Sequence, residues 1–224
     1  MSPVYAGLEK NPLFTQDKKI PFQWIQAGNT GNTGGGSPKP HGTMTWTPGP
    51  NGTVITADPA PNWDDFITYA VLPYPAMPPT KLRATAGNWS ALTPADWAKS
   101  QQIEGPQLEW IGGGFKYTCC LAVNHDVGLQ YWAGAKKWQP LGNVVVSLAN
   151  PVFWQFECSI DAQRHVLRYD WLVVNGQEAG IGIEVPAVAA PPRQKELSVA
   201  VQMDGNKDGD AYSCLLNNLV VEWA

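Results

Sequence analysis

The stretch from Phe153 to Val174 decides the fold: it reads FWQFECSI at 153–160 and VLRYDWLVV at 166–174, with a short polar segment between. Apolar and polar residues alternate along both runs, as they do in β-strands whose side chains point to opposite faces. The second run ends at Asn175-Gly176, a pair that favours a two-residue hairpin turn because both residues tolerate positive φ. We therefore predict antiparallel strands here.

The same pattern extends outward along the chain. A strand at 197–203 leads through the polar turn 204–210 into a further apolar run at 211–223. Additional strands are predicted at 43–47, 54–56, 66–72 and 107–111. The one helix candidate lies at 92–102, where Thr93 can cap the first turn and Pro94 suits the first helical position. The sequence predicts an all-β antiparallel sandwich.

Domain organisation follows from the position of the loops. Residues 1–28 are predicted to be an N-terminal arm or edge strand, because Pro21 in the apolar patch 20–25 forbids a central strand. The Gly-rich segment 28–38 is predicted to be a linker or surface loop, without the features of a phosphate-binding loop. We expect residues 29–224 to form a single β-sandwich domain.

Composition excludes several classes of function. The chain carries 15 Lys and Arg against 19 Asp and Glu, a formal charge of −4, and has no long basic run. Nucleic acid is therefore not an expected partner. No apolar stretch approaches the ~20 residues of a membrane span, and no signal peptide is visible at the start. The compartment cannot be assigned from these features.

The four cysteines, Cys119, Cys120, Cys158 and Cys214, are predicted to be reduced and buried. A cross-strand disulfide between Cys158 and Cys214 is the alternative. The spacing of cysteines and histidines fits no zinc site, and no prosthetic group is expected. The turn 204–210 begins like a calcium loop, but Leu215 stands where a bidentate Glu is needed. A hairpin turn is the simpler interpretation.

Alternation assigns an apolar face to each strand and leaves an unusually polar opposite face. Trp154, Phe156 and Cys158 are predicted to share the core face with Leu167, Tyr169 and Trp171. The opposite face would carry Gln107, Glu109, Gln155, Glu157, Arg168, Asp170 and Gln202. This face is either a solvated surface with ion pairs such as Glu157 with Arg168, or a groove that binds a polar ligand.

The tryptophans favour the groove. Aromatic rings stack on the apolar C–H faces of sugars, while amides and carboxylates bond to the hydroxyl groups. Trp132 and Trp138 flank a predicted hairpin loop and are candidates for exposed stacking surfaces, with Tyr131 beside them. These three residues could equally anchor the loop, and Trp110, Trp154, Trp171 and Trp223 are predicted to lie in the core.

The segments QLEW at 107–110, QYW at 130–132, KW at 137–138, FWQF at 153–156, VVNG at 173–176 and VQMDGN at 201–206, together with 216–223, carry a resemblance to a known superfamily. They resemble the concanavalin A-like lectin and glucanase jelly roll, and more narrowly some bacterial domains of that superfamily without a firmly assigned activity. The resemblance covers about residues 105–223. It implies a two-sheet jelly roll and suggests glycan contact outside the cell or in its envelope. Ile111 stands where those domains have Asp, which removes a possible second carboxylate.

We therefore expect non-catalytic carbohydrate binding. The predicted site consists of Gln107, Glu109, Tyr131, Trp132, Gln155, Arg168 and Gln202. One alternative is a glycan hydrolase or lyase in which Glu109 is the acid or base and Glu157 or Asp170 its partner. The other is a self-assembling module whose N-terminal arm joins the sheet edge of a second copy, giving a homo-oligomer.

Overall fold

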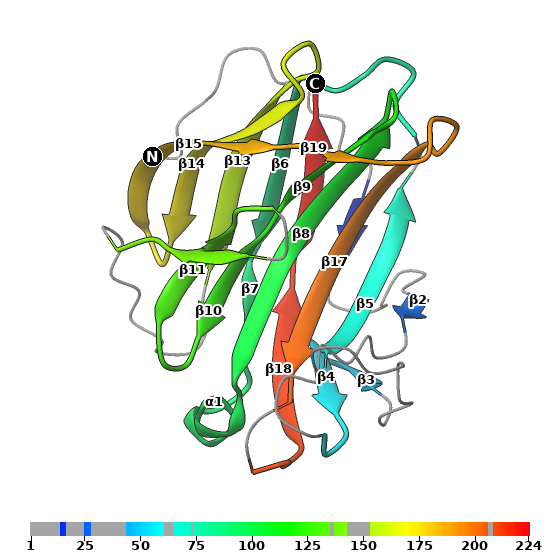
Figure 1. The fold of residues 1–224 in the computed structure, drawn as a ribbon. Helices are drawn as coiled ribbons and strands as arrows, with labels where there is room; N and C mark the ends of the chain where they lie inside the picture. Colours follow the sequence, from blue (N-terminus) through cyan, green and yellow to red (C-terminus); the bar gives the residue numbers. More distant parts are fainter. Residues whose placement is uncertain are drawn as a thin grey trace.

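The computed structural model describes residues 14–16, 25–27, 44–60, 65–72, 74–134, 137–142, 153–205 and 208–224. They form an all-β antiparallel sandwich with one short helix, which confirms the predicted fold class (Figure 1). Helix α1 (Pro94–Lys99) begins as predicted, with the Thr93 hydroxyl accepting a hydrogen bond from the Asp96 amide at 3.1 Å. Within these residues no helix is long and apolar enough to span a membrane.

Two large sheets face each other. The first has the strand order β1 (Phe14–Gln16), β19 (Leu219–Trp223), β6 (Lys81–Ala86), β13 (Trp154–Asp161), β14 (Val166–Val174), β15 (Gln177–Pro186). The second has the order β12 (Trp138–Pro140), β11 (Gly128–Trp132), β10 (Leu121–Asn124), β8 (Gln102–Gly112), β17 (Glu196–Asp204), β5 (Asp65–Leu72), β2 (Ile25–Ala27). In the second sheet β9 (Phe115–Cys119) also pairs with β8, and β16 (Val188–Ala189) pairs with β9.

A third, four-stranded sheet continues the first one rather than standing apart. Its order is β3 (Met44–Gly49), β4 (Gly52–Ala57), β18 (Tyr212–Asn217), β7 (Asn88–Ala91). The β6–β19 ladder passes into the β7–β18 ladder at Gly87 and Asn218, where the Gly87 amide donates to the Asn218 carbonyl at 3.3 Å. Asn218 has a φ of 50°, a left-handed conformation that Asn tolerates. The predicted single run at 211–223 is therefore divided between two sheets.

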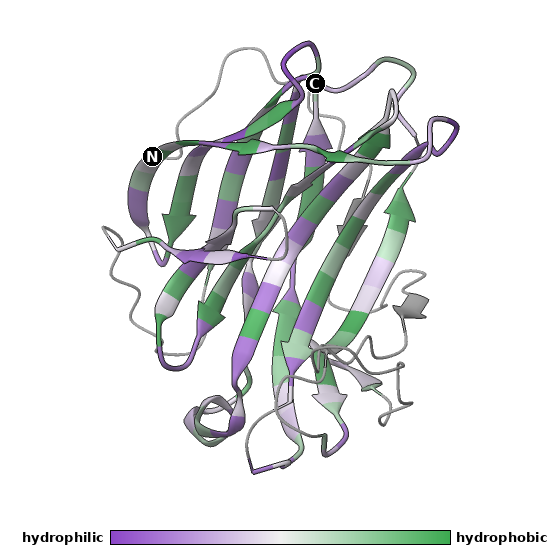
Figure 2. Ribbon diagram, viewed as in Figure 1, coloured by the Kyte–Doolittle hydropathy of each residue, from purple (hydrophilic) through white to green (hydrophobic). Residues whose placement is uncertain are grey.

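The core lies between the inner faces of the two large sheets. Alternate residues along each strand are buried there, and the hydropathy bands along β8 and β17 follow this alternation (Figure 2). Trp154 is 1% exposed, and its indole N–H donates to the Trp89 carbonyl at 2.8 Å. The Trp89 indole N–H donates in turn to the Glu104 carbonyl at 2.8 Å, so the two indoles connect β13 to β8 through the core.

Tyr169 joins the two sheets at a second point. Its side chain is fully buried, and its hydroxyl oxygen accepts from the Cys120 amide at 2.9 Å. The same hydroxyl lies 3.0 Å from the Trp132 carbonyl and 3.1 Å from the Cys120 carbonyl. Burial raises the pKa of Tyr169 well above its ordinary value, so the phenol stays protonated. This residue of β14 thus fixes the position of the strand that carries Trp132.

A β-bulge reverses one predicted side-chain direction. Between Tyr169 and Trp171 the register of β14 shifts against both neighbours, and Asp170 is the extra residue relative to β13. Trp171 consequently pairs with Glu157 on the outer face, and its indole N–H contacts the Glu178 carboxylate. The prediction that Trp171 shares the core face with Tyr169 is wrong, because strict alternation ends at the bulge.

The strands at the edges of the two large sheets come from different parts of the chain. Among the described strands, β15 forms one edge of the six-stranded sheet, and Gly182 within it has a φ of 67°. At the other edges β1 pairs with β19 and β2 pairs with β5 of the same chain. Most of the predicted N-terminal arm, with the loop at 28–38, lies outside the described residues. The division at residue 28 remains a prediction.

All four cysteines are buried and free. Burial raises the pKa of the Cys120, Cys158 and Cys214 thiols well above the ordinary value, which disfavours the reactive thiolate. We expect the native protein at about pH 8 to react negligibly with a thiol reagent such as DTNB, whereas the unreduced, denatured chain should release four equivalents of chromophore. Rapid labelling of the native protein, or a denatured count below four, would contradict this expectation.

Candidate functional site

The sandwich has two outer faces with different chemistry. We call the outer face of the nine-stranded sheet the front face, and that of the six-stranded sheet the back face. The polar residues of the front face come from β8, β9, β10, β11 and β17, and they are Gln102, Glu104, Gln107, Glu109, Lys116, Thr118, Asn124, Gln130, Glu196, Ser198, Gln202 and Asp204. The back face carries Lys81, Arg83, Gln155, Glu157, Arg168 and Trp171.

The structure divides the seven predicted site residues between these faces. Four of them, Gln107, Glu109, Trp132 and Gln202, lie on the front face. Tyr131 points the other way, with its ring edge-on to Tyr169 at 5.6 Å. Gln155 and Arg168 belong to the back face, because β13 and β14 are strands of the opposite sheet. The seven residues therefore do not surround one ligand.

The part of the front face formed by the start of β8, by β10 and by the end of β17 is a network of hydrogen-bonded polar side chains. Gln102 donates to the Glu104 carboxylate at 2.7 Å and accepts from the Asn124 amide at 3.0 Å. On β17 the Gln202 amide donates to the Asp204 carboxylate at 2.8 Å. Four of these five side chains are at least nine-tenths buried. Because each group is held by another, this network is preorganised.

Glu109 is held by two neighbours. The Lys116 ammonium lies 3.1 Å from its Oε2 atom, and the Thr118 hydroxyl donates to the same oxygen at 3.0 Å. The proposed partners Glu157 and Asp170 lie on the back face, with the core between them and Glu109. That part of the hydrolase or lyase hypothesis is therefore wrong. Two carboxylates on opposite faces of a sandwich cannot act on one glycosidic bond.

Glu157 does not pair with Arg168 as predicted. Lys81 and Arg83 bind its two carboxylate oxygens at 2.7 Å and 2.8 Å, and Glu157 is 3% exposed. Arg168 instead lies 3.5 Å from Asp170. Burial would raise the pKa of Glu157, but the hydrogen bonds from Lys81 and Arg83 outweigh it and hold the pKa below its ordinary value. The back face thus carries a buried ion cluster.

Three front-face side chains are unlike the network, because no hydrogen bond to their polar groups occurs in the described structure. They are Gln107 on β8, Gln130 on β11 and Ser198 on β17. Gln130 and Ser198 are each only 7% exposed. The polar atoms of these three side chains are still reached by solvent, so a bound molecule could bond to these amides and this hydroxyl in place of water.

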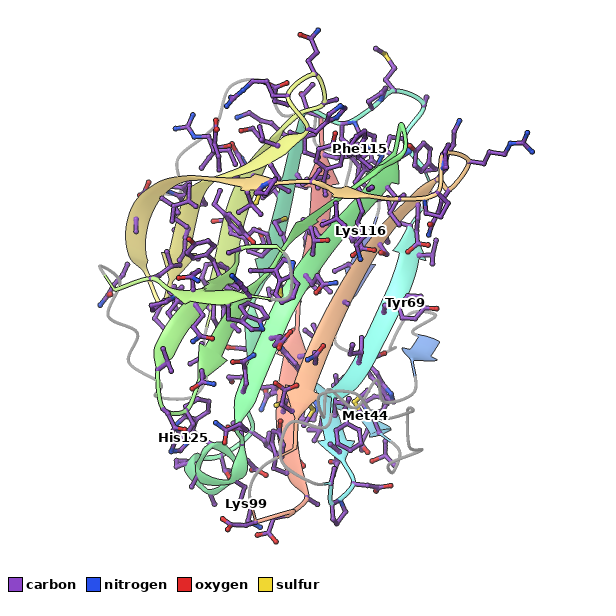
Figure 3. All side chains as sticks on the ribbon, in the orientation of Figure 1. Met44, Tyr69, Lys99, Phe115, Lys116 and His125 are labelled. Carbon is purple, nitrogen blue, oxygen red and sulfur yellow. The ribbon has the colours of Figure 1, made fainter. Side chains whose placement is uncertain are left out.

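A row of neighbouring residues crosses the strands of the nine-stranded sheet at Gln107, and aromatic side chains lie at both of its ends. On one side Gln107 pairs with Ala200, which pairs with Tyr69 of β5. Figure 3 labels the Tyr69 side chain on this strand. On the other side the Trp132 amide donates to the Cys120 carbonyl, and Trp132 pairs with Trp138 across the predicted hairpin. The two indoles are half-buried and meet edge-on at 5.3 Å. Four strand spacings separate Tyr69 from Trp132, about 19 Å. The row is long enough for an extended ligand.

A hollow of about 400 Å³ lies elsewhere, at the turn between β13 and β14. Its lining includes Arg164, Arg168 and Glu184. Arg164 binds both carboxylate oxygens of Glu184, at 2.9 Å and 2.7 Å, and Arg168 is paired with Asp170. Its cations are therefore already matched by acids, and the hollow presents no uncompensated charge to a ligand.

A metal centre finds no support in the described residues, where no group of three or more His, Cys, Asp or Glu side chains could hold an ion. Asp204, the first residue of the predicted turn, accepts from Gln202. Positions 206 and 207 of that turn lie outside the described residues.

Sequence reasoning missed much of the front face. Gln102 and Glu104 have even numbers, whereas Gln107 and Glu109 have odd numbers, so a simple alternation places them on opposite faces. The register between β8 and β17 shifts between these pairs, at Gly105-Pro106. Gly105 has a φ of 111°, and the Gly-Pro pair directly before the predicted strand at 107–111 was the available signal. Gln130 could have been found from its apolar neighbours at 129 and 131.

Comparison with solved structures confirms the fold. The chain is similar to an endo-1,3-β-glucanase from Streptomyces sioyaensis, with a TM-score of 0.52 and 11% identity over 100% of this chain and 99% of the glucanase. It is also similar to alginate lyase Aly36B, with a TM-score of 0.50 and 10% identity over 75% of this chain and 79% of the lyase. Lectin UEA-II, solved with galactose, gives a TM-score of 0.48 and 9% identity over 94% and 97% of the two chains.

The chain therefore has the concanavalin A-like jelly-roll fold that the sequence resemblance implied. No protein-family profile matches the chain, and no curated protein matches it either.

Proposed function

We propose that the chain binds a carbohydrate on the front face and does not cleave it. The observation that carries this proposal is the row through Gln107, in which the side-chain amide of Gln107, without a hydrogen bond in the described structure, lies between Tyr69 and Trp132. The side chains of Gln130 and Ser198 lie in neighbouring rows of the same face. Amides and hydroxyls both donate and accept, which suits sugar hydroxyls. Aromatic rings supply apolar contact area at little entropic cost.

Two solved proteins with similar folds support a carbohydrate as ligand. The glucanase and the lyase are named for β-1,3-glucan and alginate, respectively. Fold likeness alone does not assign a function, so the proposal depends on the front face itself. Binding without catalysis is favoured because the described contacts of the Glu109 carboxylate are with Lys116 and Thr118, and no second carboxylate that could act with it is among them.

The test compares alanine substitutions of two glutamines that lie on opposite faces of the sandwich. We expect Gln107→Ala to weaken oligosaccharide binding about 10-fold, since one lost hydrogen bond corresponds to about 1 kcal/mol or somewhat more. Trp132→Ala should weaken binding at least as much through lost stacking. Gln155→Ala, on the back face, is the matched control and should leave the dissociation constant unchanged.

The ligand is first selected on a glycan array that includes β-1,3-glucan and alginate oligosaccharides. Dissociation constants are then measured by calorimetry, and circular dichroism verifies that each variant is folded. Equal losses for Gln107→Ala and Gln155→Ala would place the site elsewhere. Release of reducing ends or of unsaturated sugars by the purified protein would contradict binding without cleavage.

A further inference from the structure

The hydroxyl group of Tyr169 lies at the end of a backbone ladder in the opposite sheet. In the nine-stranded sheet β10 and β11 pair antiparallel up to Leu121 and Tyr131, and the next two residues are Cys120 and Trp132. The Trp132 amide donates to the Cys120 carbonyl at 2.9 Å. An antiparallel pair of this type normally exchanges a second bond, from the other amide to the other carbonyl.

The phenol of Tyr169 takes the place of that second bond. The Cys120 amide donates to the phenol oxygen at 2.9 Å, and the phenol donates to the Trp132 carbonyl at 3.0 Å. The Cys120 carbonyl, 3.1 Å away, shares the same proton. Two hydrogen bonds in series span more distance than one, so this side chain of β14 holds the ends of β10 and β11 apart.

The same residue determines where the Trp132 ring lies. The ring of Tyr131 packs edge-on against the ring of Tyr169 at 5.6 Å, which directs Tyr131 into the core. Side chains alternate along a strand, so Trp132 points to the front face, where its ring meets that of Trp138 at 5.3 Å. One residue of the opposite sheet therefore holds both the Trp132 carbonyl and the neighbouring ring.

Tyr169 cannot contact a ligand itself, because its side chain is fully buried. Its influence on binding must pass through the residues that it holds. An aromatic ring already fixed in its binding orientation loses less entropy when a sugar stacks on it, so a rigid support raises affinity.

We propose that Tyr169 is a positioning residue of the front-face site: its phenol, inserted between Cys120 and Trp132, orients the Trp132 ring for stacking and thereby sets the affinity for carbohydrate. This inference rests on the proposed carbohydrate-binding function and gives a residue of the opposite sheet a role in it.

The first variant is Tyr169→Phe, which keeps the ring in the core and removes only the hydroxyl. The Cys120 amide and the Trp132 carbonyl then close on each other or lose their partner, and in both cases the Trp132 ring moves. The probe is laminaritetraose or an alginate tetrasaccharide, whichever the glycan array selects. We expect Tyr169→Phe to weaken its binding about 3- to 10-fold, the effect of one net hydrogen bond.

The matched control is Tyr212→Phe, which also removes one buried hydroxyl that donates to a backbone carbonyl. Tyr212 is 2% exposed, and its hydroxyl bonds to the Asp204 carbonyl at 2.9 Å, at the end of β17. We expect this variant to lose as much stability in guanidinium as Tyr169→Phe and to keep the wild-type dissociation constant.

A double-mutant cycle tests whether Tyr169 acts through Trp132. Calorimetry gives the dissociation constants of wild type, Tyr169→Phe, Trp132→Ala and the double variant. We expect Tyr169→Phe to weaken binding only where Trp132 is present, so that the ratio of dissociation constants is about 1 in the Trp132→Ala background.

A measurement without ligand follows the ring itself. In protein labelled with 5-fluorotryptophan, the fluorine resonance of Trp132 is the one that disappears in Trp132→Ala. We expect it to move in Tyr169→Phe and to stay in place in Tyr212→Phe, a difference that a general loss of stability does not produce. If Tyr169→Phe does not fold, Tyr131→Leu removes the ring contact with Tyr169 instead, and it should move the same resonance and weaken binding.

Three results would overturn the inference while leaving the carbohydrate site intact. They are an unchanged dissociation constant in folded Tyr169→Phe, an equal loss with and without Trp132, and an unmoved Trp132 resonance. A blank glycan array, with neither tetrasaccharide bound by the folded wild-type protein, would instead disprove the proposed function and the inference with it.

Discussion

Replacing Trp154 by alanine is expected to lower the free energy of unfolding by about 4 kcal/mol, within the range typical of a large buried side chain. Trp154 is 1% exposed and packs between the sheets, so its removal leaves a cavity that the surrounding β-strands cannot fill. The change also removes the hydrogen bond from the Trp154 indole to the Trp89 carbonyl at 2.8 Å, and the loss of a buried hydrogen bond adds to the cost.

The matched control is Trp138→Ala, because Trp138 is half-buried at the end of β11–β12 and outside the core. Guanidinium unfolding followed by circular dichroism measures both variants without depending on the fluorescence of the removed indoles. We expect Trp138→Ala to cost about 1 kcal/mol or less. Equal losses for the two variants would show that the indole chain through Trp89 does not stabilise the sandwich.

Glu157→Ala is expected to lower the free energy of unfolding by about 3 kcal/mol near neutral pH, as for other buried ion pairs that lose one partner. The change removes the carboxylate that binds Lys81 and Arg83, and Arg83 is itself largely buried, with 12% of its side chain exposed. Glu222, 3.6 Å from the Arg83 guanidinium, compensates only part of this charge.

The cost of Glu157→Ala should depend on pH. The pKa of Glu157 is held below its ordinary value in the folded state, so its stabilising effect is complete above the pKa of the unfolded chain. The effect is lost as the pH falls through the lower, folded-state pKa. The difference between wild type and variant should therefore shrink on acidification, as measured by denaturant midpoints from neutral to acidic pH.

Glu184→Ala is the control for this pH series. It also breaks a carboxylate–arginine pair, with Arg164, but that pair lies in solvent, and we expect little change in the midpoint. A Glu157 effect that stays constant down to strongly acidic pH would mean that the lost stability comes from packing rather than from the ion cluster.

The hairpins of this protein could be predicted because turn residues carry local signals. The Asn175-Gly176 turn has φ values of 49° and 78°, as the pair requires, and the Asp161 carboxylate accepts from the amides of Gln163 and Arg164 in the preceding turn. Both features depend only on residues within a few positions of each other. Alternation then identified the core faces of β13 and β17 correctly.

The site was harder to predict, because it depends on how strands are assigned to sheets. Alternation tells which residues of one strand share a face, but it does not tell which sheet the strand joins. Gln107 and Gln155 therefore looked equivalent in the sequence, although the core lies between them. Irregular positions added a second error, since the Asp170 bulge moved Trp171 to the back face and the shift at Gly105 hid Glu104.

The edge position of β15 among the described strands has a consequence for the protein at high concentration. An exposed edge strand is a template on which a second chain can add by backbone hydrogen bonding, and this is a common start of aggregation. β15 interrupts such a template with Gly182 in a left-handed conformation, with the charged side chains of Glu178 and Glu184, and with Pro186 at its end. We therefore expect substitutions that make β15 regular and apolar to promote aggregation through this edge.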